Sequence, residues 1–414
     1  MYPNVIKSKY LKIISFCCAS VVPLLVTGPF LPDLTVSLLS IWFLYYSLKN
    51  KMYAMYRNIY FYFFSAFCLV CIISSFLSDN IFISLKPSLF YFRIGIFALL
   101  ISYLIDHYKN ILNYFYYAFI ITFCSLIIDG YIQYLTGLNL FGFGIRDHGR
   151  ISSFFGKELI LGSYLTRLFP LFFALFVARS NKRPLEIYGI SFLFILIEVL
   201  VFLAGERASF VLLNVSTIFI VLLIYQYKWL RLWTFIASLG IITLLLVNDP
   251  GLYNRYIKSP TESMGLNDKN AEKKIFSPSH DFLLKTAFKM FLDKPIFGHG
   301  PKSFRIKCED FRGLEKNQTC NLHPHNFYAQ LLAETGILGF LFLFGLFLYI
   351  IFFSMRHILE YFTFKRLLLS DYQICLFAGL LITTFPFTSN GNFFTNHLML
   401  MYGLQLGFFR KKIK

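Results

Sequence analysis

A short polar cluster in the last quarter of the chain combines residue types that suit acid–base chemistry. Residues 323–326 read His-Pro-His-Asn, and an apolar segment punctuated by Gly336 and Gly339 follows them. A histidine with an ordinary pKa near 6.5 can accept a proton close to neutral pH, so His325 is a candidate base. A polar cluster at the start of an apolar helix suits a site at a membrane surface, where a lipid-borne substrate meets a second reactant. The alternative is that His325 lies at the interface and hydrogen-bonds only a loop backbone.

The composition indicates that this cluster belongs to a membrane protein. The chain has 414 residues, of which 57% are hydrophobic, 20% aromatic and 14% charged. In an ordinary soluble domain about a quarter of the residues are charged. Apolar runs recur along the chain at close to the length of about 20 residues that crosses a bilayer as a helix. These features exclude a soluble enzyme, a secreted disulfide scaffold and a disordered protein.

The net charge of +18 raises nucleic acid as a partner. The basic residues fall mostly in short connectors between the apolar runs, however, as the positive-inside rule predicts for a membrane protein. The sequence has no basic helix with interleaved aromatic residues of the kind that binds a groove of nucleic acid. We therefore expect the lipid bilayer as a partner and no nucleic acid.

The apolar runs predict an all-α polytopic membrane protein with about 12 transmembrane helices. The expected spans are residues 11–31, 33–48, 59–78, 88–105, 111–129, 160–178, 185–204, 208–226, 230–248, 335–354, 371–388 and 394–409. Alternate connectors are basic, and so is the tail at 410–414, which predicts that both termini are cytoplasmic.

One connector is long enough to fold as a small domain outside the membrane. It covers residues 249–334, and its amphipathic pattern predicts short helices. It separates the first nine expected helices, in residues 1–248, from the last three and the cytoplasmic tail, in residues 335–414.

Two cysteines, Cys308 and Cys320, lie together in this long connector. Outside the cytoplasm the compartment is oxidising, which favours a disulfide between them over two unpaired thiols. His323 and His325 could add two ligands for zinc, but neither a CxxC nor an HxxxH spacing is present, and we expect no metal.

The polar cluster resembles the signature of the O-antigen ligase and polymerase superfamily. The likeness rests on His325-Asn326, nine intervening residues, Gly336 and then Gly339. Three further segments carry the same resemblance: Arg-Ile-Ser-Ser-Phe-Phe-Gly at 150–156, Gly-Glu-Arg-Ala-Ser at 205–209, and Asp-Lys-Pro-Ile-Phe-Gly-His-Gly-Pro at 293–301.

This resemblance implies a GT-C-like inverting glycosyltransferase in the bacterial inner membrane. Such an enzyme transfers a glycan from undecaprenyl pyrophosphate to an acceptor sugar at the periplasmic face, and it needs no cofactor and no metal. The long connector is then a periplasmic loop domain, and the base role falls on His325. A chain-length regulator is a further candidate partner.

Arginines are the expected ligands of the pyrophosphate, because the planar guanidinium binds phosphate oxygens in pairs and stays charged. Arg207 is the first candidate; the alternative is a local ion pair with Glu206. Family members usually carry a second arginine where this chain has His280. That departure puts a strict two-arginine clamp in doubt, and the substitutes are Arg305, Lys285, Lys302 or His280 itself.

Further polar residues complete the set of candidates. Lys86 and Arg93 project from one face of the fourth expected span, where they either line an entry for the lipid pyrophosphate or extend to the interface. Glu198 and Arg167 lie inside spans, and a structural pair between them is an alternative to a catalytic task. The remaining candidates for binding substrate are Arg150, Asn326 and His323.

Four functions remain open from the sequence. A ligase moves the glycan onto lipid A-core, whereas a polymerase joins repeat units on the same carrier. A protein-directed oligosaccharyltransferase of similar architecture is a third option. Polymerases tend to have two comparably large periplasmic loops, and the single long loop here favours the ligase modestly. A transporter of the same lipid-linked sugar is less favoured, because we see no repeated halves and the polar groups gather at one membrane face.

Overall fold

The computed structural model describes residues 8–146, 149–180, 182–266, 276–313 and 318–409. The basic tail at 410–414, on which part of the predicted topology rests, lies outside these residues. The described residues form helices and connecting loops without a β-strand; their only bridges are Leu138 with Gly144 and Arg146 with Arg150. The prediction of an all-α membrane protein is therefore confirmed.

Nine helical segments among the described residues are long and apolar enough to cross a membrane. They are α1 (Ser8–Leu24, extended by a 3₁₀ turn to Thr27), α2 (Phe30–Lys49), α3 (Ile59–Phe76), α4 with α5 (Ile81–Phe90 and Phe92–His107), α6 (Ile111–Thr136), α7 (Leu161–Ala178), α8 (Pro184–Leu203), α10 (Lys228–Asn248) and α15 (Phe327–Phe364).

The three other expected spans coincide with shorter helices, namely α9 (Arg207–Leu223), α16 (Asp371–Thr383) and α17 (Asn396–Phe408). The full count of about 12 transmembrane helices stays a prediction. Several expected boundaries are wrong. The fourth segment begins at Ile81 rather than at residue 88, because Pro87 lies inside α4 without ending it. The helices α6 and α15 also extend beyond the expected spans 111–129 and 335–354.

Helix α7 lies at the centre of the bundle and packs against α6, α8, α9 and α16. It is apolar on all sides, and its phenylalanines are fully buried, as expected for a helix surrounded by other helices. Phe169 and Phe173 both contact Phe194 of α8 edge-on. Arg167 is the one charged side chain of this helix. The position of Arg167 is therefore fixed by the packing of the whole of α7.

The structure does not pair Glu198 with Arg167. Glu198 on α8 instead forms a buried ion pair with Arg231 on α10, and Thr217 and Ser238 complete its surroundings. Arg231 falls within the expected span of residues 230–248, and it lies inside α10 and is fully buried. The pair joins two neighbouring helices that run in the same direction, α8 and α10, whose relative register the sequence alone did not give.

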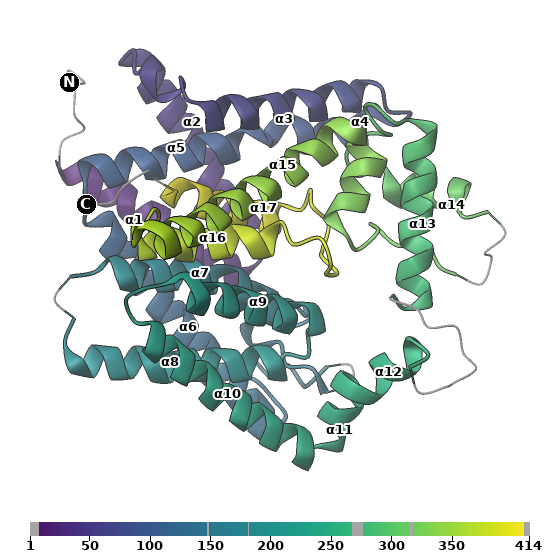
Figure 1. The fold of residues 1–414 in the computed structure, drawn as a ribbon. Helices are drawn as coiled ribbons and strands as arrows, with labels where there is room; N and C mark the ends of the chain where they lie inside the picture. The colour runs from purple at the N-terminus through teal and green to yellow at the C-terminus, as the bar shows by residue number, and fades with distance from the viewer. Residues whose placement is uncertain (1–7, 147–148, 181, 267–275, 314–317, 410–414) are drawn as a thin grey trace.

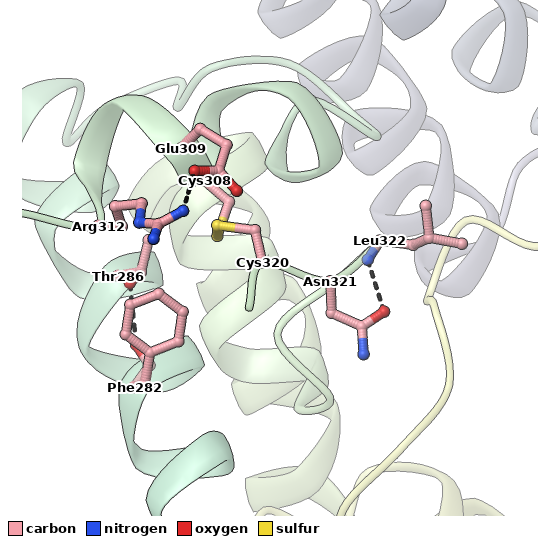
Figure 2. The surroundings of a disulfide bond; sticks show 8 residues. All are labelled: Phe282, Thr286, Cys308, Glu309, Arg312, Cys320, Asn321 and Leu322. Carbon is pink, nitrogen blue, oxygen red and sulfur yellow. Dashed lines mark hydrogen bonds and ion pairs between the residues drawn. A yellow bond between two sulfur atoms is a disulfide. The ribbon is translucent and has the colours of Figure 1, made fainter. Parts of the chain in front are cut away.

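The long connector forms helices α11 (Pro250–Tyr253), α12 (Ser259–Ser263), α13 (Pro278–Asp293) and α14 (Phe304–Phe311). They lie together at the end of the bundle opposite the start of α1 (Figure 1). Cys308 and Cys320 form a disulfide that ties α14 to the loop before the histidine cluster, as Figure 2 shows. Cys308 is buried in a small apolar core with Phe282 and Met290 of α13.

The loop after α13 is fastened to a kink in α15 by backbone hydrogen bonds. The N–H groups of His299 and Gly300 donate to the carbonyls of Ala333 and Glu334, at 3.0 and 2.8 Å, and that of Ile337 donates to Pro295 at 2.8 Å. These bonds are possible because the helix breaks at Gly336.

Gly336 has a φ of +64°, and a Cβ there would collide with the backbone of Ile296. The segment at 293–301 and the segment that contains Gly336, both part of the sequence resemblance, therefore pack directly against each other.

We expect Gly336→Ala to destabilise the protein severely. An alanine would have to adopt a left-handed φ and displace the Ile296 backbone, which together cost about 2–5 kcal/mol. Gly345→Ala is the matched control, because it lies on the same helix with only an ordinary contact, 3.8 Å from Phe63. Thermal melting of the purified proteins should show a large loss for the first variant and none for the second; equal melting temperatures would contradict the kink assignment.

Candidate functional site

A cavity of about 660 Å³ opens between the α8–α9 turn, the start of α13 and the start of α15. Its wall is completed by residues 387–391, which connect α16 to α17. Six residues predicted from the sequence line it: Arg150, Arg207, His280, His323, His325 and Asn326. Segments that lie far apart along the chain thus supply one site.

Three histidines stand side by side in this cavity. The ring centroids of His323 and His325 are 4.3 Å apart, and those of His280 and His325 are 5.5 Å apart. His325 has a φ of +56°, a left-handed conformation that is uncommon for residues other than glycine. Its carbonyl accepts a hydrogen bond of 2.7 Å from the N–H of Asn390, which holds the residue in place.

The imidazole of His325 presents a hydrogen-bond acceptor. The side-chain amide of Asn321 lies with its nitrogen 2.8 Å from Nε2 of His325, and its oxygen accepts from the N–H of Leu322. Figure 2 shows this second bond beside the disulfide that anchors the loop. In the tautomer whose Nε2 is unprotonated, Nε2 accepts from the Asn321 amide, and a substrate hydroxyl must displace that amide before Nε2 can act as a base.

Burial keeps the histidines neutral. It lowers the pKa of His325, and the neighbouring His280 lowers it further. The pKa of His280 is lowered by burial and by the charge of Arg207. Burial and His325 lower the pKa of His323 to about 4. At neutral pH the cavity therefore contains uncharged imidazoles among fixed cations.

Four arginines give the cavity its positive charge: Arg150, Arg167, Arg207 and Arg255. Arg255 donates from Nε to the carbonyl of Gly205 at 2.7 Å, and Arg150 donates to the carbonyls of Ala204 and Leu159 at 3.4 and 3.2 Å. Both satisfy the C-terminal carbonyls of α8, where a helix dipole favours cations. They thereby fix the turn that carries Arg207, whose side chain is exposed in the cavity.

Glu206 is engaged with α7. Its carboxylate accepts hydrogen bonds from the N–H groups of Gly162 and Ser163, at 2.8 and 3.1 Å, and from the hydroxyl of Ser209 at 3.0 Å. Burial raises the pKa of this carboxyl to about 7, although Arg150 opposes the shift. The ion pairs of the described residues do not include Glu206 with Arg207, so the local pairing that the sequence left open is not observed.

The sequence analysis missed the role of two arginines. Arg255 lies in a polar stretch with no distinguishing pattern. Arg167 was noted only as a charge inside a span; it is 3% exposed, donates to Oδ1 of Asn390 at 2.8 Å, and lies over the rings of Phe327 and Tyr402. One of its terminal nitrogens is buried without a hydrogen-bond partner among the described residues, so it is available to bind a ligand in the cavity that Arg167 lines.

The other predicted residues lie elsewhere. Lys86 and Arg93 line a second cavity, together with Lys302, and Arg93 forms an ion pair with Asp33. Arg305 is exposed on α14, and the lining of neither cavity in the described part of the chain includes it. Lys285 pairs with Asp281 on its own helix at 2.7 Å. His280 therefore stands alone in the place where a second arginine was expected.

Metal ligands do not gather at this site. Within residues 8–146, 149–180, 182–266, 276–313 and 318–409, no group of three or more His, Cys, Asp and Glu side chains could hold a metal ion.

The fold and the cavity define a multi-pass membrane protein with an enzyme-like site of neutral histidines among arginines at one end of the bundle. Residues 191–344 match the protein family described as O-antigen ligase. The predicted resemblance to the O-antigen ligase and polymerase superfamily is thereby confirmed over this segment. The match includes Arg207, Arg255, His280 and the histidine cluster, whereas Arg150 and Arg167 come from the preceding part of the chain. No curated protein matches the sequence.

Arg167→Met should loosen the segment that holds His325. Methionine keeps the length of the side chain but cannot donate to Asn390, and a hydrogen bond from a charged group contributes about 1.5–3 kcal/mol. We expect backbone hydrogen exchange in residues 387–393 to accelerate roughly ten- to a hundredfold, by the same conversion. Global stability should change little, because removing a buried charge offsets the lost bond.

Arg356→Gln, at an exposed position near the far end of α15, is the control for this measurement. Unchanged exchange in the Arg167 variant would show that the segment is held by its other contacts.

Proposed function

We propose that this protein is an O-antigen ligase-type inverting glycosyltransferase in lipopolysaccharide biosynthesis. It would transfer a glycan from undecaprenyl pyrophosphate to a sugar hydroxyl of lipid A-core, at the periplasmic face of the bacterial inner membrane. The observation that carries the proposal is the juxtaposition of a base-competent His325 with several fixed guanidinium groups in one cavity. A base beside cations is what displacement of a pyrophosphate by a hydroxyl requires.

The proposed reaction is a single displacement. The acceptor oxygen attacks the anomeric carbon as its proton passes to Nε2 of His325, and a new C–O bond forms. The bond from that carbon to the pyrophosphate oxygen breaks, and undecaprenyl pyrophosphate departs with the electron pair. The anomeric configuration is inverted, and His325 later returns its proton to solvent. Neither a metal nor a cofactor is needed for this sequence of steps.

Arg207 is assigned to the departing pyrophosphate, because its exposed guanidinium faces the cavity. Arg150 and Arg255 would add long-range positive potential while they hold the turn. Asn326 caps α15 by accepting from the N–H groups of Tyr328 and Ala329, at 2.9 and 3.1 Å. Its role is then to position His325, whereas His280 and His323 would contribute as neutral hydrogen-bonding groups.

The proposed topology follows from the site. With both termini cytoplasmic, residues 249–334 form a periplasmic domain between the helices of residues 1–248 and those of residues 335–414. The disulfide between Cys308 and Cys320 supports this side for the loop, because disulfides persist in oxidising compartments. A chain-length regulator is a further proposed partner.

A polymerase that joins repeat units on undecaprenyl pyrophosphate is the second candidate function. The ligase and the polymerase use the same donor. The observation that favours a polymerase is a second basic cavity beside the first. A gel of lipopolysaccharide from a deletion strain, probed for O-polysaccharide, separates the two. Bare core with long chains retained on undecaprenyl pyrophosphate is the expected result; core bearing a single repeat unit would establish the polymerase, and an unchanged profile would refute both.

His325→Ala should reduce the transfer rate by about 10²–10⁴-fold, the usual contribution of a general base, while the protein keeps its melting temperature. The pKa of His325 is lowered from 6.5, so the neutral base persists on acidification to below that pH. In the wild-type enzyme kcat/KM should stay level from neutral pH down to about 6.5 and fall only below it.

The pH dependence of kcat/KM, measured with purified donor and acceptor, checks this assignment. An acid limb centred above pH 7, or full activity of His325→Ala, would move the base role to another residue.

A further inference from the structure

A second cavity, of about 950 Å³, lies between α2, α4, α5 and the start of α17. It shares walls with the first. In the loop before α7, Leu159 lines the first cavity while Glu158 and Ile160 line the second. In the segment leading to α17, Asn390 faces the first cavity and Asn396 the second. The two cavities are therefore neighbours on either side of the same two loops.

Cationic side chains from three parts of the chain line this second cavity, namely Lys86 on α4, Arg93 on α5 and Lys302 in the loop before α14. Arg93 is 9% exposed, and its Nε is buried without a hydrogen-bond partner. The ion pair with Asp33 engages its other end and holds the guanidinium in place. Glu158 is the remaining carboxylate of the lining, so the cations outnumber the carboxylates.

Lys86 and Lys302 line the same cavity. The pKa of Lys302 is lowered first by burial and then by the charge of Arg305; Glu334 opposes this shift, and Lys86 adds to it. Lys302 also has a φ of +64°, so the backbone holds this residue in an unusual conformation. Like charges held together at this density are stabilised when an anion lies between them.

The start of α17 adds donors to the same wall. Thr395, Asn396 and His397 all line the cavity, and the helix has no side-chain cap at its N-terminus. Uncapped N–H groups and the helix dipole favour an anion at that position. Nε2 of His397 is also buried without a hydrogen-bond partner, which is a third unsatisfied donor or acceptor beside the same space.

The other side of the cavity is apolar and accessible from the outside of the bundle. Phe90 and Phe92 line it with 54% and 42% of their surface exposed, and Ile41 of α2 lines it with 61% exposed. Exposed aromatic and aliphatic side chains on a membrane helix face lipid. An anion site that opens through such side chains suits a ligand whose charged group is attached to a hydrocarbon chain.

We propose that this second cavity binds a phosphate-bearing lipid, which is the acceptor substrate of the transfer reaction. The inference rests on the proposed function, in which the donor pyrophosphate occupies the first cavity with Arg207. A transferase holds its two substrates next to each other, and the two cavities lie on either side of the same two loops. The acceptor is either a second undecaprenyl pyrophosphate or a phosphorylated lipid A; both present phosphate oxygens next to a lipid chain.

The test measures the binding of two probes to the full chain in phosphatidylcholine nanodiscs. The probes are undecaprenyl pyrophosphate and lipid A 1,4′-bisphosphate. In Lys86→Gln/Lys302→Gln we expect the second-cavity ligand to bind about a hundredfold more weakly, since each lost charge-assisted contact costs roughly tenfold. The control, Lys289→Gln, removes an exposed lysine of α13 that lines neither cavity and should change the affinity less than twofold.

The two probes distinguish the sources of the phosphate. Loss of one of two undecaprenyl pyrophosphate sites in the double variant indicates a polymerase-type acceptor, and loss of lipid A binding indicates a ligase-type acceptor. If the double variant binds both probes as Lys289→Gln does, the proposal is wrong.

Arg207→Lys separates this outcome from failure of the proposed function. That variant should weaken binding of the donor pyrophosphate and leave the second-cavity ligand unaffected. If undecaprenyl pyrophosphate binding depends on Arg207 but not on the two lysines, the function stands and the second site does not. If binding does not depend on Arg207, the proposed donor site fails, and the effect of the lysines on the lipid A probe can still be read.

Discussion

The site depends on the backbone pairing between the loop at 295–300 and the kink of α15. Three backbone hydrogen bonds join them, and the hydroxyl of Ser74 on α3 donates to the carbonyls of Phe297 and Glu334 at 2.5 and 2.8 Å. Side chains at Gly298 and Gly336 would separate the two backbones. This contact joins the loop helices to the membrane bundle. The histidine cluster comes directly before α15, whose first turns precede the kink. Glycine is needed at these two positions because the two backbones approach each other closely there.

The membrane character and six of the residues that line the first cavity could be predicted from the sequence, because local patterns carry that information. Apolar length predicts a spanning helix without knowledge of its neighbours, and the segments around Arg207 and His325 are short and contiguous. Contacts between distant helices are different. The partner of Glu198 depends on how α8 and α10 align, and the importance of Arg167 depends on Asn390, more than two hundred residues away. No periodicity within either segment contains that information.

In the first cavity the arginines are charged, whereas the histidines are neutral near neutral pH. Removing an arginine from water costs free energy without changing its protonation, because its pKa is too high to reach near neutrality. A histidine instead releases its proton when burial and neighbouring cations disfavour the charged form. Burial, with His280 beside it, lowers the pKa of His325 and so favours the unprotonated ring, which is the form that can accept a proton. At the position where the sequence resemblance predicts a second arginine, His280 adds a neutral ring 5.5 Å from that of His325.

The segment between α16 and α17 connects these features. Asn390 accepts from Arg167, donates its N–H to His325, and lies with its carbonyl 3.3 Å from Nε2 of His323. A few residues later, Asn392 accepts from Gln330 of α15 at 3.0 Å, and the chain enters α17 at the wall of the second cavity. A shift of this segment would therefore move the base and the N-terminus of α17 together. An acceptor phosphate bound at that N-terminus would stabilise the segment in the position that orients His325, because ligand and base would act on the same stretch of backbone.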